Sequence, residues 1–516
     1  MNLRICLRWT RIRSDTVKLL SVWIGKKKRD HAIYVITQKN ILRRRSLLVN
    51  SLISQKEELK RMIQWLENIL MDKALEWARE VYKAILEKVD ALLMEHRDKR
   101  LLVKHIRSRW YKTSLGAVKV KRRQYRDEKE KRYRYLLDEV SGMEKENGHT
   151  SINVQDMALG LACTMSFRRS AEILKKTTPI DLSHQRIWKL LGKVADAYIG
   201  KTENETRHFL DTGEIPQGEG KKVARLMVEA DGVMLSLQRE KARKAEAKLG
   251  IAYEGWKQVG KDRYSTVNKT IFADTGNSDQ YWAGMYLKLQ KKYDLGSLRQ
   301  TILGGDGASW VKEGIHYTGG QFQIDRYHLN RELCFALGPD KNTIRLVREA
   351  CEYGDIEKAA SLLSEARRKA TGDQADKIAR AARYLRNNSN GLRDYRLDLG
   401  EEGKGSRRTG AIEGNVDKLI VRRMKNQGMN WTLKGMRRMI YVRFLYLEGK
   451  LKDWLYQYTE PPSEVIVPVK KARRIIDKKV KEYNPHWLEA GLPALRGPHS
   501  SRPWALVLKS LTQGNI

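Results

Sequence analysis

Two aspartates occupy unusual positions in apolar segments of the chain. Residues 226–237 are rich in apolar and β-branched side chains in an alternating pattern, which predicts a buried strand. Asp231 lies in the middle of this strand, beside Gly232. Residues 300–308 predict a second short strand that ends at Asp306 among glycines. A carboxylate in such a strand is costly to bury unless a positive group meets it, and glycine allows close approach. The two aspartates therefore predict a shared cation.

Each aspartate also has an ordinary structural explanation, because Asp231 could cap a turn or pair with a lysine and Asp306 could be a turn aspartate. The overall charge favours chemistry on a polyanion. The 516 residues include 101 Lys and Arg against 62 Asp and Glu, a formal charge of +39. This balance indicates a nucleic acid as the partner, with a membrane surface as the weaker alternative.

The composition excludes several classes of protein. The chain has no apolar run of 18 residues, so no membrane-spanning helix is expected, and its N-terminus lacks the pattern of a secretion signal. Its four cysteines, at positions 6, 163, 334 and 351, form no C-x-x-C pair, which argues against a zinc knuckle or a redox motif. We expect a cytoplasmic protein associated with the nucleoid.

The N-terminal region divides into three segments. Residues 1–50 hold 13 Lys and Arg but 2 Asp and Glu, which predicts a disordered basic tail or a reading-frame extension, with a DNA arm as the alternative. Residues 51–100 predict a long amphipathic helix whose apolar stripe either packs on the body or forms a dimer seam. Residues 101–145 predict a small basic β-rich segment in which Arg122 and Arg123 are candidate DNA contacts, or else a solvated sheet face.

Residues 150–205 predict a helix-turn-helix domain. Helices are expected over 154–165 and 168–176, and Ser183 is placed to cap a third helix by accepting its free N–H groups. The start of that helix would offer its polar side chains to a DNA groove. These candidates are Ser183, His184, Gln185, Arg186 and Lys189. Three packed helices without a DNA role are the alternative.

Residues 222–450 predict an α/β domain. Strands over 226–237, 247–256 and 265–273, a helix over 277–293, and then strands and helices in alternation give the order β-β-β-α-β-α-β-α of a ribonuclease-H-like fold. The first and fourth strands are neighbours in that fold, so Asp231 and Asp306 would face each other. A helical insertion is expected over 340–395, and residues 451–516 form a C-terminal tail. The fold class is thus a ribonuclease-H-like catalytic core preceded by a mainly helical DNA-binding region.

A glycine-rich loop at 399–414 leads to a predicted helix over 412–425, with Glu413 in its first turn. From the residues alone, Glu413 could merely stabilise the helix dipole, and Glu401 and Glu402 compete with it for a catalytic role. The surrounding region is basic, which makes three of its side chains candidate DNA contacts. These are Arg422, Arg423 and Lys425.

Several short motifs, in this order along the chain, resemble those of bacterial insertion-sequence transposases with an Asp-Asp-Glu active site, specifically the ISLre-type family related to the Mutator-like group. The motifs are Val228-Glu-Ala-Asp231-Gly-Val, Gly304-Gly-Asp306-Gly-Ala-Ser-Trp310, Gln323-Ile-Asp325-Arg-Tyr-His328, Gly410-Ala-Ile-Glu413-Gly-Asn, Arg422-Arg-Met-Lys425 and the tail segment Leu492 to Trp504. The resemblance covers roughly residue 50 to the end, and the lack of a match before it favours the frame-extension interpretation of residues 1–50.

The resemblance implies a catalytic triad of Asp231, Asp306 and Glu413 that binds two Mg²⁺ ions, for which Mn²⁺ could substitute. Two such ions about 3.5–4 Å apart would stabilise the attacking and leaving oxygens of a phosphodiester. Water would first cut the DNA to free a 3′-hydroxyl at an end of the insertion sequence, and that hydroxyl would then attack target DNA. Joining two ends implies at least a dimer on double-stranded DNA.

Three further residues are accessory candidates. The resemblance places its Asp-x-x-His element on Asp325 and His328. His328 could bind metal, contact DNA or form a structural pair with Asp325, and Trp310 could pack in the core or stack on a flipped base. The resulting hypothesis is a transposase that cuts and joins DNA. The alternatives are a DNA-binding regulator with structural acids and a ribonuclease-H-like nuclease or resolvase without transposition.

Overall fold

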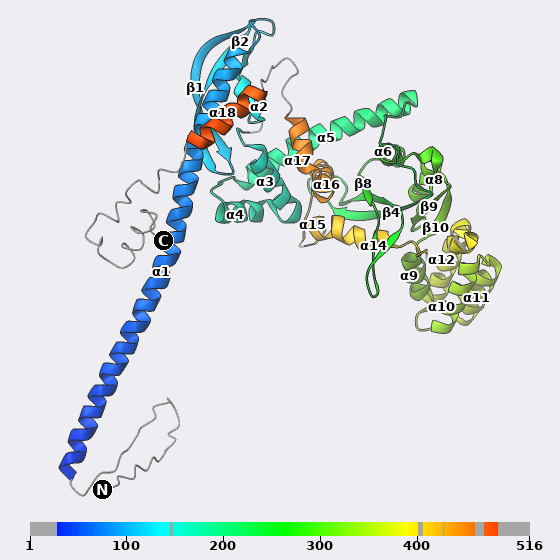
Figure 1. Cartoon of the computed structure of the whole chain (residues 1–516). Coiled ribbons are helices and arrows are strands. Elements are labelled where there is room, and N and C mark those ends of the chain that lie inside the picture. Colours follow the sequence, from blue (N-terminus) through cyan, green and yellow to red (C-terminus); the bar gives the residue numbers. More distant parts are fainter. Residues whose placement is uncertain (1–27, 145–147, 401–405, 427, 460–468, 483–516) are drawn as a thin grey trace. The chain divides into compact units, whose positions relative to one another are not determined.

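The computed structural model describes residues 28–144, 148–400, 406–426, 428–459 and 469–482, with side chains described from Lys56 to Lys478 (Figure 1). The chain divides into two compact units, Met1–Ala78 and Arg79–Ile516. In the part that the structure describes, no helix is both long enough and apolar enough to cross a membrane.

Helix α1 (Lys28–Glu95) is 68 residues long and crosses the boundary between the two units. The sequence correctly predicted a long helix but placed its start near residue 51, so the expectation of an unstructured tail is wrong for residues 28–50. Residues 1–27 lie outside the described residues. In the first unit the apolar side chains of Leu59 and Ile63 are 53% and 60% exposed. In the second unit the last turns of α1 are buried at Leu92 and Leu93.

A β-hairpin follows α1 and confirms the β-rich character predicted for residues 101–145. Strands β1 (Leu101–Thr113) and β2 (Gly116–Asp127) pair antiparallel, and the short β3 (Tyr133–Arg134) joins the far side of β2. A small hydrophobic core unites the hairpin with the end of α1 and with α2 (Leu136–Ser141).

The three helices predicted for residues 150–205 are present as α3 (Ile152–Thr164), α4 (Phe167–Thr177) and α5 (His184–Thr212). A serine caps each of them, because the hydroxyl oxygens of Ser151, Ser166 and Ser183 each accept a backbone N–H three residues later. Helix α5 continues for 29 residues and ends at Gly213, whose φ of +72° suits glycine.

A five-stranded mixed sheet forms the centre of the second unit (Figure 1). Its strands are β4 (Arg225–Ser236), β5 (Lys244–Tyr253), β8 (Thr270–Asp274), β9 (Gln300–Gly305) and β10 (Gln321–Ile324), in the order β10-β9-β4-β5-β8. Strand β4 pairs parallel with β9 and antiparallel with β5. The strands that carry Asp231 and lead to Asp306 are therefore neighbours, as the sequence predicted.

The strand predicted over residues 265–273 is two strands. Asn268 has a positive φ of 51°, and the chain turns there. The residues before it form β7 (Arg263–Thr266), which pairs with β6 (Trp256–Gly260) outside the central sheet, whereas β8 pairs with β5.

Side chains alternate between two hydrophobic cores along β4. Met227, Val233 and Leu235 pack with α3, α5, α16 (Leu433–Leu447) and α17 (Leu451–Tyr458). Leu226, Val228 and Ala230 pack on the other face with α6 (Ser278–Gln290), α9 (Arg326–Leu337) and the predicted insertion. The insertion is the three helices α10 (Lys341–Tyr353), α11 (Ile356–Lys369) and α12 (Asp373–Asn387).

The predicted helix over residues 412–425 is α14 (Ala411–Val416), a π-helical turn η4 (Asp417–Val421) and α15 (Arg422–Met424). The region predicted as a C-terminal tail contains helix α18 (Val469–Glu482), and the tail segment Leu492 to Trp504 lies outside the described residues. The remaining short elements are η1 (Leu295–Ser297), α7 (Ser309–Lys312), α8 (Gly314–Thr318), η2 (Ser389–Gly391) and α13 (Tyr395–Asp398).

Candidate metal centre

Asp231 lies on the face of β4 that also carries Glu229, because alternate residues of a strand share a face. Its side chain is buried, and its Oδ1 accepts the backbone N–H of Gly232 at 2.7 Å. Burial raises the pKa of Asp231, and the nearby carboxylates of Asp306 and Asp325 raise it further. A buried carboxylate in this situation is stabilised by a positive partner.

Glu413 reaches the same place from the first turn of α14. The position of that turn is fixed by Glu229, whose Oε2 accepts the backbone N–H groups of Gly410 at 3.0 Å and Ile412 at 2.9 Å. The hydroxyl of Tyr253 donates to the other oxygen of Glu229. A strand residue two positions before Asp231 thus holds the start of the helix that carries Glu413, although the two segments are far apart in sequence.

Glu229 is a functional candidate that the sequence analysis did not single out. It is 1% exposed, and burial raises its pKa while its hydrogen bonds to Tyr253 and to the start of α14 oppose that rise. The signal was available, since Glu229 is a second acid on the same face of the same apolar strand as Asp231.

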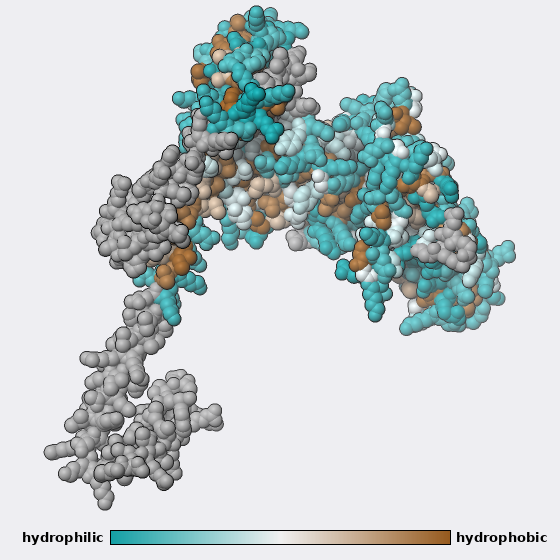
Figure 2. All heavy atoms as spheres, viewed as in Figure 1, coloured by the Kyte–Doolittle hydropathy of each residue, from teal (hydrophilic) through white to brown (hydrophobic). Residues whose placement is uncertain are grey.

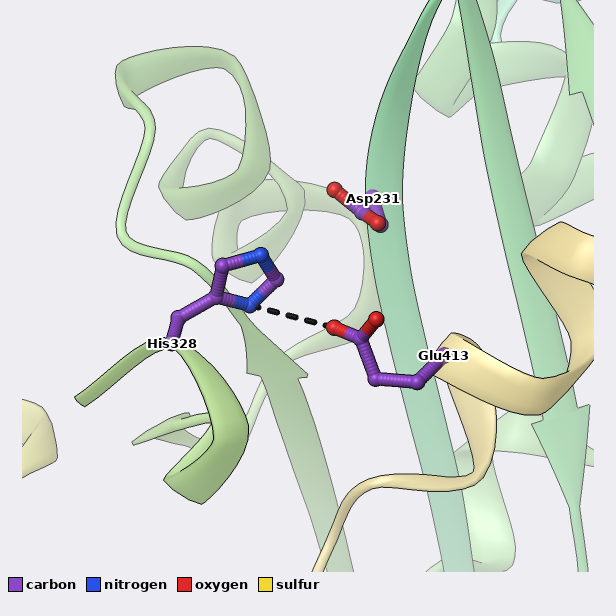
Figure 3. Close-up of side chains that lie close together, drawn as sticks. All are labelled: Asp231, His328 and Glu413. Carbon is purple, nitrogen blue, oxygen red and sulfur yellow. Dashed lines mark ion pairs between the residues drawn. The ribbon is translucent and has the colours of Figure 1, made fainter. Parts of the chain in front are cut away.

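Asp325 and His328 form the third side of the site. Asp325 caps α9 through the N–H of Tyr327, and its own N–H donates to the carbonyl of Gly305 at the end of β9. His328 Nδ1 lies 3.0 Å from Asp325 Oδ2. The same nitrogen lies 3.2 Å from Glu413 Oε1 (Figure 3). The structural Asp–His pair considered from the sequence is therefore present, and it lies within the site.

Asp231, His328 and Glu413 point toward one another from three different elements (Figure 3). Each offers a ligand atom, and these atoms all lie within 4.8 Å of one another. The predicted triad of Asp231, Asp306 and Glu413 thus needs a correction, because His328 and not Asp306 completes this tight group. Glu401 and Glu402 lie outside the described residues.

Asp306 directly follows β9, and its side chain is turned toward its own loop. Its Oδ1 accepts the N–H of Ala308 at 2.9 Å, and its carbonyl accepts the hydroxyl of Tyr384 on α12 at 2.9 Å. Asp306 still contributes to the raised pKa of Asp231, so the two charges act on each other across the neighbouring strands. The hydrogen bonds of Asp306 are therefore those of a turn aspartate, which was the alternative considered from the sequence.

The carboxylates and the imidazole shift one another's protonation. Burial first, and then Asp325 and Asp231, raise the pKa of Glu413 to about 7. Burial would lower the pKa of His328, but the carboxylates of Asp325, Glu413 and Asp231 raise it overall. Burial would raise the pKa of Asp325, but hydrogen bonds from His328 and Tyr327 lower it overall.

The donor set fits a divalent cation. Glu413 Oε1 is buried, and its ion-pair partner in the described part of the chain is His328 Nδ1 at 3.2 Å, which is also hydrogen-bonded to Asp325. Two carboxylates therefore share one imidazole, and a bound cation would supply a second positive charge beside them. Carboxylate oxygens suit Mg²⁺ and Mn²⁺, and a neutral imidazole is a common ligand of transition metals. Asp231 and Glu413 could hold such an ion, with His328 beside it.

The candidate DNA contacts at the start of α5 have different surroundings. Gln185 and Lys189 are exposed, and Ser183 is the helix cap. His184 is partly buried. The guanidinium of Arg186 packs over Gly148, and its Nη2 is enclosed without a hydrogen-bond partner among the described residues. Gln185 and Lys189 are therefore accessible to a ligand, whereas the guanidinium of Arg186 is partly enclosed by its packing contacts.

Three other predicted DNA contacts have structural roles instead. Arg122 is 4% exposed and pairs with Asp138, and Arg123 pairs with Asp90 of α1. Arg423 is buried, where its Nε donates to the carbonyl of Ala162 at 2.8 Å. These residues were expected to face DNA because of their charge, and the expectation is wrong because each one satisfies buried groups inside the protein.

The remaining basic candidates lie at the surface. Arg422 pairs with Asp417 and keeps 64% of its side chain exposed. Lys425 is also exposed.

Trp310 is a packing residue. Its ring lies edge-on to Tyr281 at 5.3 Å, and its carbonyl accepts the indole N–H of Trp282 at 2.6 Å. Lys248 lies over the ring at 5.5 Å. The core-packing interpretation therefore describes its contacts.

A family model described as "Uncharacterised protein family (UPF0236)" matches residues 57–455. The "UPF0236 protein in vanSb 3'region" of Streptococcus gallolyticus is 28% identical over 451 residues, which cover 84% of this chain and 94% of the relative. "UPF0236 protein TTE2489" of Caldanaerobacter subterraneus subsp. tengcongensis is 25% identical over 378 residues, covering 72% and 76%. A further relative from that strain is 25% identical over 381 residues, covering 72% and 75%, and its printed name joins eleven locus labels.

These matches correct the resemblance drawn from the short motifs. The family that the chain matches is an uncharacterised one, and the printed names of these relatives mention no transposase. The assignment to the ISLre-type transposase family is therefore wrong. Short motifs of acids, glycines and basic residues were too weak a basis for assigning a family.

Proposed function

Because the chain belongs to UPF0236, a family of uncharacterised proteins, we propose a function from its own side chains: metal-dependent cleavage and joining of DNA strands, as in transposition. The observation that carries this proposal is the convergence of Asp231, His328 and Glu413 on one partly buried point. Their positions span more than a third of the chain, so the fold and not local sequence brings them together.

The sheet supports the proposal. Its order β10-β9-β4-β5-β8, with β5 antiparallel and β9 parallel to the central β4, is the order expected for a ribonuclease-H-like core. Asp231 lies on the central strand β4, Asp306 directly follows its parallel neighbour β9, and Glu413 lies on the later helix α14. Three acids from separate elements therefore support the proposal.

In this proposal Asp231 and Glu413 hold the divalent cation, with Asp306 available from the adjoining strand for a second one. A bound Mg²⁺ or Mn²⁺ would supply Lewis-acid activation of the phosphodiester. Glu229 keeps α14 in place, and Asp325 orients the imidazole of His328 by accepting its Nδ1–H. The chain itself therefore provides the orientation of the ligands.

Two features outside the site support DNA as the substrate. The formal charge of +39 favours a polyanion. One relative has a name that joins eleven locus labels from one strain. Such a name is expected for a gene that is present in many copies in one genome. Multiple copies in one genome are what a mobile element produces.

The test uses the purified full-length protein, Mg²⁺ and a labelled duplex that contains the DNA flanking the gene. We expect nicked and joined products with the parent protein. Asp231→Asn and Glu413→Gln should lower the rate by at least about 100-fold, because each removes a ligand charge from the site. Glu349→Gln, at an exposed position on α10, is the matched control and should retain full activity.

The outcomes separate the candidate functions. Cleavage without joining would favour a nuclease or resolvase. DNA binding without metal-dependent products in the parent would favour a regulatory protein whose acids are structural. Equal activity of Asp231→Asn and the parent would overturn the proposal.

A further inference from the structure

We propose that the outer face of the β1–β2 hairpin is a contact surface for duplex DNA. This hairpin face consists of Ile106, Ser108 and Trp110 on β1 with Lys119 and Lys121 on β2. The inference rests on the proposed function for the identity of the polyanion, and it assigns the contact to residues other than Arg122 and Arg123.

The register of the hairpin defines this face. Trp110 lies opposite Lys119, Ser108 opposite Lys121 and Ile106 opposite Arg123, so their side chains project to the same side of the sheet. The alternate β2 residues Val118 and Val120 project to the other side and are buried.

The hairpin face is exposed to an unusual degree. Strand β1 is an edge strand of its sheet, and from Leu102 to Trp110 it is exposed on both faces, including the residues of the hairpin face. Ile106 is 63% exposed and Trp110 is 57% exposed. In Figure 2 the part of the molecule that Figure 1 labels β1 and β2 is mostly hydrophilic, with apolar atoms between. Large apolar side chains that remain in water beside basic ones are typical of an interaction surface.

The charge of the hairpin is almost entirely positive. Residues 101–127 contain nine Lys and Arg, and their one acid, Asp127, pairs with Arg134 of β3. Arg122 and Arg123 are neutralised by Asp138 and Asp90 from outside the hairpin. Lys119 and Lys121 have no ion-pair partner in the part of the chain that the structure describes, and Lys119 Nζ lies 6.0 Å from the centre of the Trp110 ring. The face therefore presents unpaired positive charge.

Basic residues on an edge strand can also serve only to prevent aggregation, and an open edge can receive a strand from a second copy. The properties of the hairpin face favour contact with DNA over both of these explanations. Protection against aggregation does not explain the exposure of Ile106 and Trp110, and two copies would bring the same unpaired positive charges together. A two-stranded ribbon also fits the major groove of DNA, where basic side chains contact phosphates and apolar ones contact bases.

The experiment measures binding of a fluorescein-labelled duplex of generic sequence by anisotropy, with EDTA present so that no chemistry occurs. Lys119→Glu with Lys121→Glu should weaken binding by at least about tenfold and reduce the slope of log affinity against log salt by about two, because two phosphate contacts are lost. Trp110→Ala should also weaken binding. Lys341→Glu with Arg348→Glu on α10 makes the same change in net charge and should have a much smaller effect.

The possible results are distinct. If the parent binds DNA and the Lys119 and Lys121 variant binds equally well, the surface assignment is wrong although the proposed function stands. If the parent binds no DNA, the proposed function itself is wrong. If light scattering shows that the variant changes oligomeric state while DNA affinity is unchanged, the face contacts a second copy instead. Circular dichroism confirms that each variant is folded.

Discussion

At the scale of single residues, the site is organised by carboxylates with different tasks. Asp231 and Glu413 point into the buried space, whereas Glu229 points at backbone N–H groups and never reaches that space. Glu229 is therefore a positioning residue that acts through α14. Its neighbour on β9, Gly304, leaves room for it, since a Cβ there would lie 3.1 Å from Glu229 Cγ.

Replacing Glu229 by Leu tests this positioning role. The change leaves the N–H groups of Gly410 and Ile412 without an acceptor, which costs about 1–3 kcal/mol for each buried group. We expect a lower melting temperature and at least about tenfold weaker Mn²⁺ binding in a calorimetric titration, because α14 no longer holds Glu413 in place. Glu229→Gln keeps an acceptor and should recover most of the affinity. Loss of stability with unchanged Mn²⁺ affinity would contradict the positioning role.

The site was largely visible in the sequence at this scale, but its geometry was not. Asp231, Glu413, Asp325 and His328 were all named from motifs, and the structure brings all four together. The orientation of Asp306 depends on the turn after β9 and could not be read from residue types. Arg122 was wrongly predicted to contact DNA. The alternation of side chains along the strand already places it on the same face as the buried Val118 and Val120.

At the scale of elements, local signals located helix starts well. Ser183 before an apolar run marked the start of α5, because a capping hydroxyl acts over one turn. Strand pairing was harder. The break that separates β7 from β8 depends on the positive φ of Asn268, and asparagine is also common in ordinary turns. The start of α1 was missed because residues 28–50 show no sustained apolar period.

An ion network joins the end of the insertion to the segment before α14. Asp394 caps α13, and its carboxylate pairs with Arg396 at 2.8 Å and Arg408 at 2.9 Å. Arg408 also pairs with Glu352 of α10. Burial would raise the pKa of Asp394, but these guanidinium groups hold it well below its usual range. The network therefore connects Asp394 and the insertion helix α10 to Arg408, which lies within the glycine-rich segment 399–414.

This network predicts a pH dependence of stability. A carboxyl group with a lowered folded-state pKa stabilises the fold above its unfolded-state pKa of about 3.9 and loses that contribution as the pH falls. Asp394→Asn should lower the free energy of unfolding at pH 7, measured with urea, and the difference from the parent should shrink below about pH 4. Asp262→Asn, at an exposed turn, is the control. A difference that stays constant from pH 7 to pH 3 would exclude this role.

At the scale of the whole molecule, positive charge is distributed unevenly between buried and exposed positions. Arg122, Arg423 and Arg443 are buried and bind protein groups, so net charge alone overstates the number of positive groups at the surface. The β1–β2 hairpin and the start of α5 have exposed basic side chains. Composition correctly indicated a basic protein, but the folded chain decides which charges face a partner.

The central claim is that Asp231, His328 and Glu413 surround a divalent cation. Anomalous scattering from crystals grown with Mn²⁺ and duplex DNA measures this directly. We predict a manganese peak at about 2.0–2.4 Å from carboxylate oxygens of both Asp231 and Glu413, within the range of metal–oxygen bonds. Manganese bound only elsewhere, with these three side chains in their present positions and no peak between them, would contradict the account.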